Sequence, residues 1–175
     1  MQHDFYPVDI LDHVGSVVGS KPRREVDKRV DIVNAIHIIL ITPLGEVIMS
    51  MIPVREDLPN VYAGKLGTTV ATLKRSQETE VEGAVRAISR ELFIDHMPLT
   101  HLATHYYDHM PPKPGCKFSM FYGISDVPES YSIIDIDGLI VMTPKEIDDL
   151  IASDPHSFAY SFLKIWKDYR DKLPL

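Results

Sequence analysis

The sequence predicts an α+β domain, because it combines a strand buried on both faces, a long amphipathic helix and two capped helices near its end. Residues 33–42 are continuously apolar and rich in β-branched side chains, which favours a strand in the middle of a sheet. Residues 81–92 repeat apolar side chains every three or four positions, the period of a helix with one buried face. The 175 residues, of which 45% are hydrophobic, are enough for one domain with one core.

The N-terminal region, residues 1–32, predicts a hairpin followed by a connector. Its turn is expected near Gly15, and the charged residues 21–31 form the connector. Residues 54–66 are polar and predict a loop that crosses the mouth of a site. Further strands or extended segments are predicted at residues 46–52, 67–73, 99–110 and 117–125, with a proline-rich turn at 111–115.

The long helix is predicted from its apolar stripe. Its inward side chains recur at spacings of three and four; they are Val81, Ala84, Val85, Ile88 and Leu92. The opposite face would point away from the core; it carries Ala87, Arg90, Ile94 and, at its edge, Glu91. The helix is expected to end near Asp95, before Pro98.

Two further helices are predicted from their start signals. The run from Thr143 to Glu146 has the form of a capping box with proline in the first turn. Asp154 and Pro155 are predicted to cap the last helix. The inward stripe of that helix is mainly aromatic, which indicates core rather than a cofactor site; it consists of Phe158, Phe162, Ile165, Trp166 and Tyr169.

Residues 71–94, from Ala71 to Ile94, resemble without a gap the loop and helix with which Nudix hydrolases hold a metal-bound diphosphate. That signature is Gly, five residues, Glu, seven residues, Arg-Glu, an apolar residue, one more, Glu-Glu, one more, Gly and an apolar residue. The places that it defines are held here by Thr72, Glu78, Arg86, Ala87, Ile88, Arg90, Glu91, Phe93 and Ile94. Both glycines and two of the three metal-binding glutamates are therefore replaced, so the box is degenerate.

The resemblance extends over nearly the whole chain. The parts that are similar to the isopentenyl diphosphate isomerase-like branch of the Nudix superfamily are residues 8–12 with Gly15, Gly19 and Arg24, and the segments 33–41, 44–49, 142–147 and 158–166. This resemblance implies that residues 1–175 form a single Nudix-type α/β/α sandwich, a mixed β-sheet with helices on both faces. It does not imply an isomerase, because Cys116 lies outside the place where that enzyme has its cysteine.

The replaced glutamates determine the chemistry that the resemblance implies. In an intact box, three glutamates occupy the places of Ala87, Arg90 and Glu91, and Mg²⁺ needs such hard oxygen ligands. Glu91 remains as the metal ligand, so Mg²⁺ or Mn²⁺ is expected to bind weakly. The positive charge of Arg90 weakens binding of a dication, since like unit charges about 4 Å apart repel each other by roughly 4 kcal/mol at an effective dielectric of 20. Arg90 either contacts a phosphate oxygen in place of the metal or pairs with a nearby acid.

A second alignment, shifted by four residues, uses Arg90, Glu91 and Leu92 with Asp95 as the closing acid and Glu82 near the start. It would place Ile94 where a ligand belongs and turn Asp95 toward the apolar stripe. The first alignment is preferred, and Glu82 with Arg86 is then expected to be an ordinary pair on a solvated helix face.

Two other groups of polar side chains indicate weaker hypotheses. A strand would place three histidines on one face but too far apart to share one ion; they are His101, His105 and His109. Four acids lie in the segment where many Nudix enzymes keep a general base; they are Asp126, Glu129, Asp135 and Asp137. Their spacing does not distinguish one of the four.

Composition excludes several classes of partner. The formal net charge is -7 and no basic cluster is present, which argues against nucleic-acid binding. A single cysteine excludes an internal disulfide, and no stretch has the form of a signal peptide or a membrane span. A cytoplasmic protein is expected, and its oligomeric state is left open.

Two functions remain open from the sequence. In the first, a Nudix-fold protein has lost or strongly reduced hydrolysis and is kept as a module that binds a nucleotide- or diphosphate-like ligand or a protein partner. In the second, a divergent Mg-dependent hydrolase cleaves a nucleoside diphosphate linked to another moiety. The resemblance implies Glu91 and Glu78 as catalytic residues, Glu91 as metal ligand, and Arg86 with Arg90 as ligand-binding residues.

Overall fold

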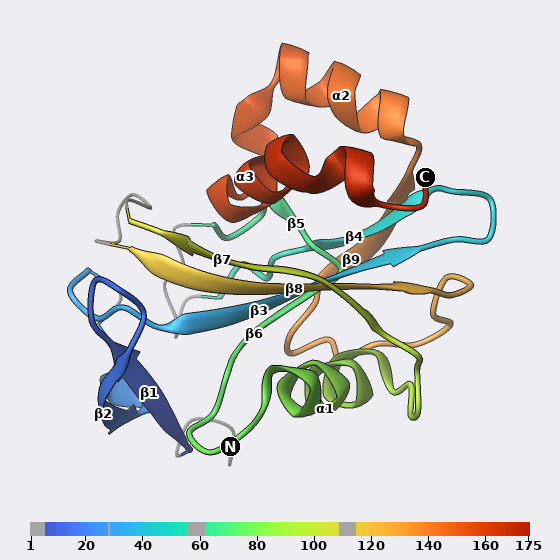
Figure 1. Cartoon of the computed structure of the whole chain (residues 1–175). Coiled ribbons are helices and arrows are strands. Elements are labelled where there is room, and N and C mark those ends of the chain that lie inside the picture. The colour runs from blue at the N-terminus through green and yellow to red at the C-terminus, as the bar shows by residue number, and fades with distance from the viewer. Residues whose placement is uncertain (1–5, 28, 56–61, 109–114) are drawn as a thin grey trace.

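A computed structural model describes residues 6–27, 29–55, 62–108 and 115–175 (Figure 1). The strands are β1 (Pro7–Leu11), β2 (Val17–Pro22), β3 (Asn34–Ile41), β4 (Val47–Met51), β5 (Leu66–Gly67), β6 (Val70–Leu73), β7 (Thr100–Tyr107), β8 (Cys116–Ile124) and β9 (Gly138–Met142). The α-helices are α1 (Glu80–Leu92), α2 (Pro144–Ser153) and α3 (Tyr160–Tyr169). Short 3-10 turns are formed by Arg23–Glu25, Pro155–Ser157 and Arg170–Lys172.

The main sheet is mixed and has β3 near its centre. Its strand order is β5-β4-β3-β8-β7, while β6 pairs with β3 and β9 pairs with β4. β3 and β8 run parallel, with Asn34 opposite Lys117, and the other pairs are antiparallel. Every residue of β3 is buried, as the continuous apolar run predicts. The predicted α+β class with a mixed sheet is confirmed.

Helices cover both faces of this sheet, with α1 on one side and α2 and α3 on the other (Figure 1). Side chains of β3 alternate between the two layers. Ile36, Ile38 and Leu40 belong to the apolar cluster that includes α1, whereas Ala35 and Ile39 belong to the cluster that includes α3. The architecture is therefore the predicted α/β/α sandwich.

The predicted N-terminal hairpin is present as a separate two-stranded sheet. β1 and β2 are antiparallel, and Gly15 in their connection has a φ of 85°. The Leu11 N–H donates to the Ile32 carbonyl at 2.8 Å, and the Ser76 N–H donates to the Pro7 carbonyl at 2.9 Å. β1 is thus hydrogen-bonded at its end to the connector before β3 and at its start to the segment that leads into α1.

Other local predictions differ from the structure. Asp154 does not cap the last helix, because Pro155–Ser157 forms a 3-10 turn and α3 begins at Tyr160 after the extended Ala159. β9 was not predicted, although its run from Leu139 to Met142 is apolar. Residues 56–61 of the predicted loop and 109–114 of the predicted turn lie outside the described residues. None of the helices described in the chain is both long and apolar enough to span a bilayer.

Candidate functional site

The two ends of α1 are fixed by local backbone chemistry. The Thr79 hydroxyl accepts from the Glu82 N–H at 3.2 Å, and the Glu82 carboxylate accepts from the Thr79 N–H at 2.8 Å, a capping box. The helix ends at Phe93, which adopts a left-handed φ of 56°. A bulky side chain rarely takes this conformation, which glycine adopts without strain. The helix therefore closes at the place where the Nudix signature has glycine, and this supports the first alignment.

The buried face of α1 differs from the predicted face. Val81 and Val85 are 53% and 39% exposed, whereas Ala87 is 0% and Glu91 4% exposed. Gly83 allows this orientation, since a Cβ there would lie 2.3 Å from a side-chain atom of β3. The prediction that Ala87 and Glu91 point away from the core is wrong.

The connection between β8 and β9 covers the side of α1 that carries Glu91. The Ser132 N–H donates to the Glu91 backbone carbonyl at 2.7 Å. Ile136 is buried in the same apolar cluster as Ala87, and Tyr131 packs against that cluster. This tertiary cover explains why positions that the helical period assigns to the outside are enclosed.

Glu91 and Arg90 form a hydrogen-bonded ion pair at this enclosed edge. Arg90 Nη2 donates to Glu91 Oε1, and Arg90 Nε lies 3.8 Å from Asp135 Oδ2. The Ser132 hydroxyl donates to the same Asp135 oxygen at 2.7 Å. Burial raises the pKa of the Glu91 carboxyl to about 8, although the charge of Arg90 opposes this rise. Of the four acids that the sequence could not rank, the structure places Asp135 beside the pair.

Glu78 and Arg86 form a second pair, between the loop before α1 and the second turn of that helix. Arg86 donates from Nε to Glu78 Oε1 at 2.6 Å and from Nη2 to Oε2 at 2.9 Å. The Arg75 N–H donates to Glu78 Oε2 at 2.9 Å. Burial alone would raise the pKa of Glu78, but these hydrogen bonds lower it below its usual range. The expected pair of Glu82 with Arg86 is not formed, because Glu82 caps the helix and Arg86 contacts Glu78.

Two residues that the sequence did not single out complete this region. The guanidinium carbon of Arg75 lies 4.3 Å from the centre of the Tyr6 ring, and that of Arg86 lies 6.0 Å from it. Lys74, next to Arg75, pairs with Asp9 of β1 at 3.3 Å. Arg75 could have been noticed as a third arginine in the box-like segment, but no local pattern connects Tyr6 with it.

The donor set at α1 does not fit a metal held as an intact Nudix box holds it. Of the three places where an intact box has metal-binding glutamates, only that of Glu91 holds a carboxyl group. Ala87 lies in the apolar cluster, and the Arg90 guanidinium is hydrogen-bonded to Glu91. Within the described ranges, no three acidic, histidine or cysteine side chains are grouped so that they could share an ion. Weak binding of Mg²⁺ or Mn²⁺ stays a prediction.

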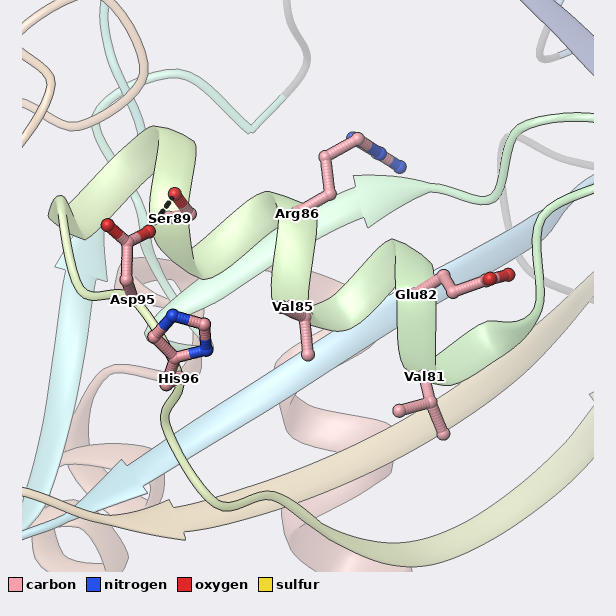
Figure 2. A pocket seen from close by; sticks show the side chains of 7 residues that line it. All are labelled: Val81, Glu82, Val85, Arg86, Ser89, Asp95 and His96. Carbon is pink, nitrogen blue, oxygen red and sulfur yellow. Dashed lines mark hydrogen bonds between the residues drawn. The ribbon is translucent and has the colours of Figure 1, made fainter.

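A shallow hollow of about 420 Å³ lies on the exposed side of α1 (Figure 2). It is lined by Val81, Glu82, Val85, Arg86, Ser89, Asp95 and His96. Arg86 extends from the helix on a different side from Val81 and Val85 (Figure 2). Asp95 accepts a hydrogen bond from the Ser89 hydroxyl at 2.6 Å. The second alignment therefore gains no support, because Glu82 and Asp95 have separate local partners and Glu91 is not part of this hollow.

The histidines of β7 do not share one face as predicted. His101 is opposite Phe121 and His105 is opposite Phe118 in β8, with an irregularity between His101 and Ala103. Phe121 and Phe118 belong to the two different apolar clusters. A bulge shifts the alternation by one residue, so these two histidines point to opposite faces, and His109 lies outside the described residues.

Comparison with known proteins gives a consistent picture of the architecture. No protein-family model matches the sequence, and no curated protein matches it. Among solved structures, DR0079 from Deinococcus radiodurans matches with a TM-score of 0.69 at 19% identity, over 85% of this chain and 90% of that one. A MutT protein from Methanosarcina mazei matches with a TM-score of 0.64 at 12% identity, over 85% and 98% of the two chains. The Nudix domain of Shewanella oneidensis NrtR, complexed with ADP-ribose, matches with a TM-score of 0.61 at 9% identity, over 87% and 92%. Together with the mixed sheet between α1 and the α2–α3 layer, these matches show that the chain has the Nudix fold.

Proposed function

We propose that this chain is a Nudix-fold protein that has lost or strongly reduced hydrolysis and binds a nucleotide- or diphosphate-like ligand. The observation that carries the proposal is the pairing of Arg90 with Glu91, beside an Ala87 that contributes to the apolar cluster. A guanidinium on the remaining carboxylate competes with a dication for the same oxygen. The complex of a similar fold with ADP-ribose supports the ligand class.

The finer placement rests on sequence likeness. The segments shared with the isopentenyl diphosphate isomerase-like branch, and a box in which Thr72, Ala87, Arg90 and Phe93 replace signature residues, support a degenerate member of that branch. We place the protein in the cytoplasm on its composition. A protein partner would be an additional use of the same fold.

Calorimetric titration with Mn²⁺ tests the loss of metal chemistry. The parent protein is expected to bind Mn²⁺ weakly, and Glu91→Gln should change this little. Incubation with Mg²⁺ and a panel of nucleoside diphosphates linked to other groups, including ADP-ribose, should release no product. A single tight Mn²⁺ site that disappears in Glu91→Gln, together with turnover, would instead establish the divergent hydrolase that uses Glu91, Glu78 and a loop acid.

A gain-of-binding variant tests the same reasoning in the other direction. Arg90→Glu removes the competing charge and adds a carboxylate next to Glu91 and Asp135, so Mn²⁺ affinity should rise. Adding Ala87→Glu supplies the third ligand of an intact box, but it puts a carboxyl into an apolar cluster, at a cost of several kcal/mol. Arg90→Gln is the matched control, because it removes the charge without adding a ligand. A folded Arg90→Glu protein that binds Mn²⁺ no better than Arg90→Gln contradicts the assignment of Arg90 to a ligand place.

A further inference from the structure

The second strand of the N-terminal hairpin, β2, is open on its outer edge and on both faces. Among the described residues β2 pairs with β1 alone, so its other edge has no neighbouring strand. Residues 17–20 are exposed in succession, and side chains of a strand alternate between its faces, so neither face of β2 is covered. β2 lies beside the main sheet and apart from the three helices (Figure 1). A further strand can therefore reach its backbone.

Three valines on this hairpin are largely exposed. Val14, Val17 and Val18 are 69%, 61% and 65% exposed. Single exposed apolar side chains are common on protein surfaces, but a group of them marks a place where another surface docks. Val18 also has no residue opposite it in β1, because the register shifts between Ile10 and Leu11. A hairpin of two strands is only marginally stable, and a further strand that paired with β2 would cover these valines and stabilise it.

The charge of this edge favours a second copy of the chain as the occupant. Two copies with a net charge of -7 each repel one another over most of their surfaces, but residues 13–20 contain no lysine, arginine, aspartate or glutamate. Lys21, which follows this stretch, is paired with Asp31 at 2.7 Å. An edge that carries valines and no charge is complementary to itself when two copies are related by a two-fold axis. The uncharged edge therefore lets two copies approach without like charges in opposition.

We propose that a second copy of this chain docks on β2, so that the two hairpins form one four-stranded antiparallel sheet in the order β1-β2-β2-β1. A two-fold axis at Val18 would bring the two Val18 side chains opposite each other and Val17 opposite Gly19 of the other copy. Lys21 would then lie opposite Gly15 of the other copy and meet no charge. One short strand from each copy gives a small interface, below about 1,200 Å² in total, so the dimer is reversible. Its formation requires neither a ligand nor hydrolysis, and it is therefore independent of the proposed function.

Sedimentation velocity from about 5 to about 500 µM tests the dimer, since an interface of this size should associate in that range. The parent should change from monomer to dimer as its concentration rises, and added salt should favour the dimer by screening the repulsion between the acidic copies. Val18→Lys places two like charges at the axis and should raise the dissociation constant by about tenfold or more. This variant also makes each copy less acidic, so its loss of association cannot come from general repulsion.

Leu44→Lys is the matched control. Leu44 is 85% exposed in the connection between β3 and β4, and the change in charge is the same. Its dissociation constant should stay within about twofold of that of the parent, since exposed substitutions away from an interface have small effects. Urea unfolding verifies that both variants fold.

Two measurements locate the interface. Amide hydrogen exchange in β2 should be slower at dimer concentrations than at monomer concentrations, with little change elsewhere. Val18→Cys should link two copies by a disulfide under mild oxidation, because directly opposite Cβ atoms lie close together. The parent should give no link, since Cys116 is fully buried.

Three results would overturn the proposal. They are a parent that remains monomeric over the whole range, a dimer that persists in Val18→Lys, and a dimer in which exchange slows at another element. A monomeric parent whose β2 amides become protected by an added valine-rich extended peptide would identify the edge as a docking site for another protein. That outcome, too, would exclude the second copy.

Discussion

Truncating Leu92 should cost far more stability than truncating Val81, although both were predicted on the same apolar stripe of α1. Leu92 is 2% exposed and belongs to the cluster between α1 and the sheet. Leu92→Ala removes buried carbons and leaves a cavity, so the free energy of unfolding should fall by about 2–5 kcal/mol. Val81 is 53% exposed, and alanine has the better helix propensity, so Val81→Ala should change stability by less than about 0.5 kcal/mol.

Urea unfolding provides the measurement, followed by far-UV circular dichroism and by fluorescence. Trp166 is the single tryptophan of the chain, and it is 3% exposed on α3, on the other face of the sheet. It therefore reports unfolding of the whole sandwich and not only of α1. A loss of less than about 1 kcal/mol for Leu92→Ala, or an equal loss for both variants, would show that the face of α1 is assigned wrongly.

Three further predictions concern α1. Gly83→Ala should lower the unfolding free energy by about 1 kcal/mol in the same urea assay. The added Cβ would lie 2.3 Å from Ile36 Cδ1, and the cost of this overpacking should exceed the free energy gained from the better helix propensity of alanine. A more stable variant would show that the Ile36 side chain moves aside without cost. Phe93→Gly should be more stable than Phe93→Ala by about 1 kcal/mol, because the left-handed φ of 56° strains any side chain; equal midpoints would contradict that backbone. Glu91→Gln should change the pH dependence of stability. Burial raises the pKa of Glu91 in the folded state above the value of 4.5 that holds in the unfolded chain, so the parent loses stability as pH rises from 4.5 toward the folded-state pKa. The urea midpoint of Glu91→Gln relative to the parent should thus rise between pH 5 and pH 9, and a constant difference would refute the raised pKa.

The elements that the sequence predicts well are those whose signals are local. The continuous apolar run fixes β3 at the centre of the sheet, and the capping box at Thr143 opens α2 at Pro144 as expected. The turn at Gly15 likewise follows from a residue that tolerates positive φ. Each of these conclusions depends on neighbours in the chain and not on distant contacts.

The face of α1 and the composition of the site depend on distant contacts. Both Val81 and Ala87 can extend a stripe through Ala84 and Ile88, and hydrophobicity favours the valine. The structure selects Ala87, because the residues around Ile136 cover that side. For the same reason the sequence does not predict the contact of Tyr6 with Arg75. That contact forms because Val8 of the hairpin pairs with Arg75 in the loop before α1.

The parallel pairing of β3 with β8 has a consequence for how the chain reaches its fold. Cys116, the first residue of β8, donates through Sγ to the carbonyl of Val33, 83 residues earlier. During synthesis β3 and its antiparallel neighbours β4 and β6 are complete long before β8 leaves the ribosome. One edge of a fully buried, mainly apolar strand then stays open until a long loop closes, which slows folding and exposes a surface prone to aggregation. The most buried strand of the finished molecule is thus the most vulnerable one while the chain is still being made.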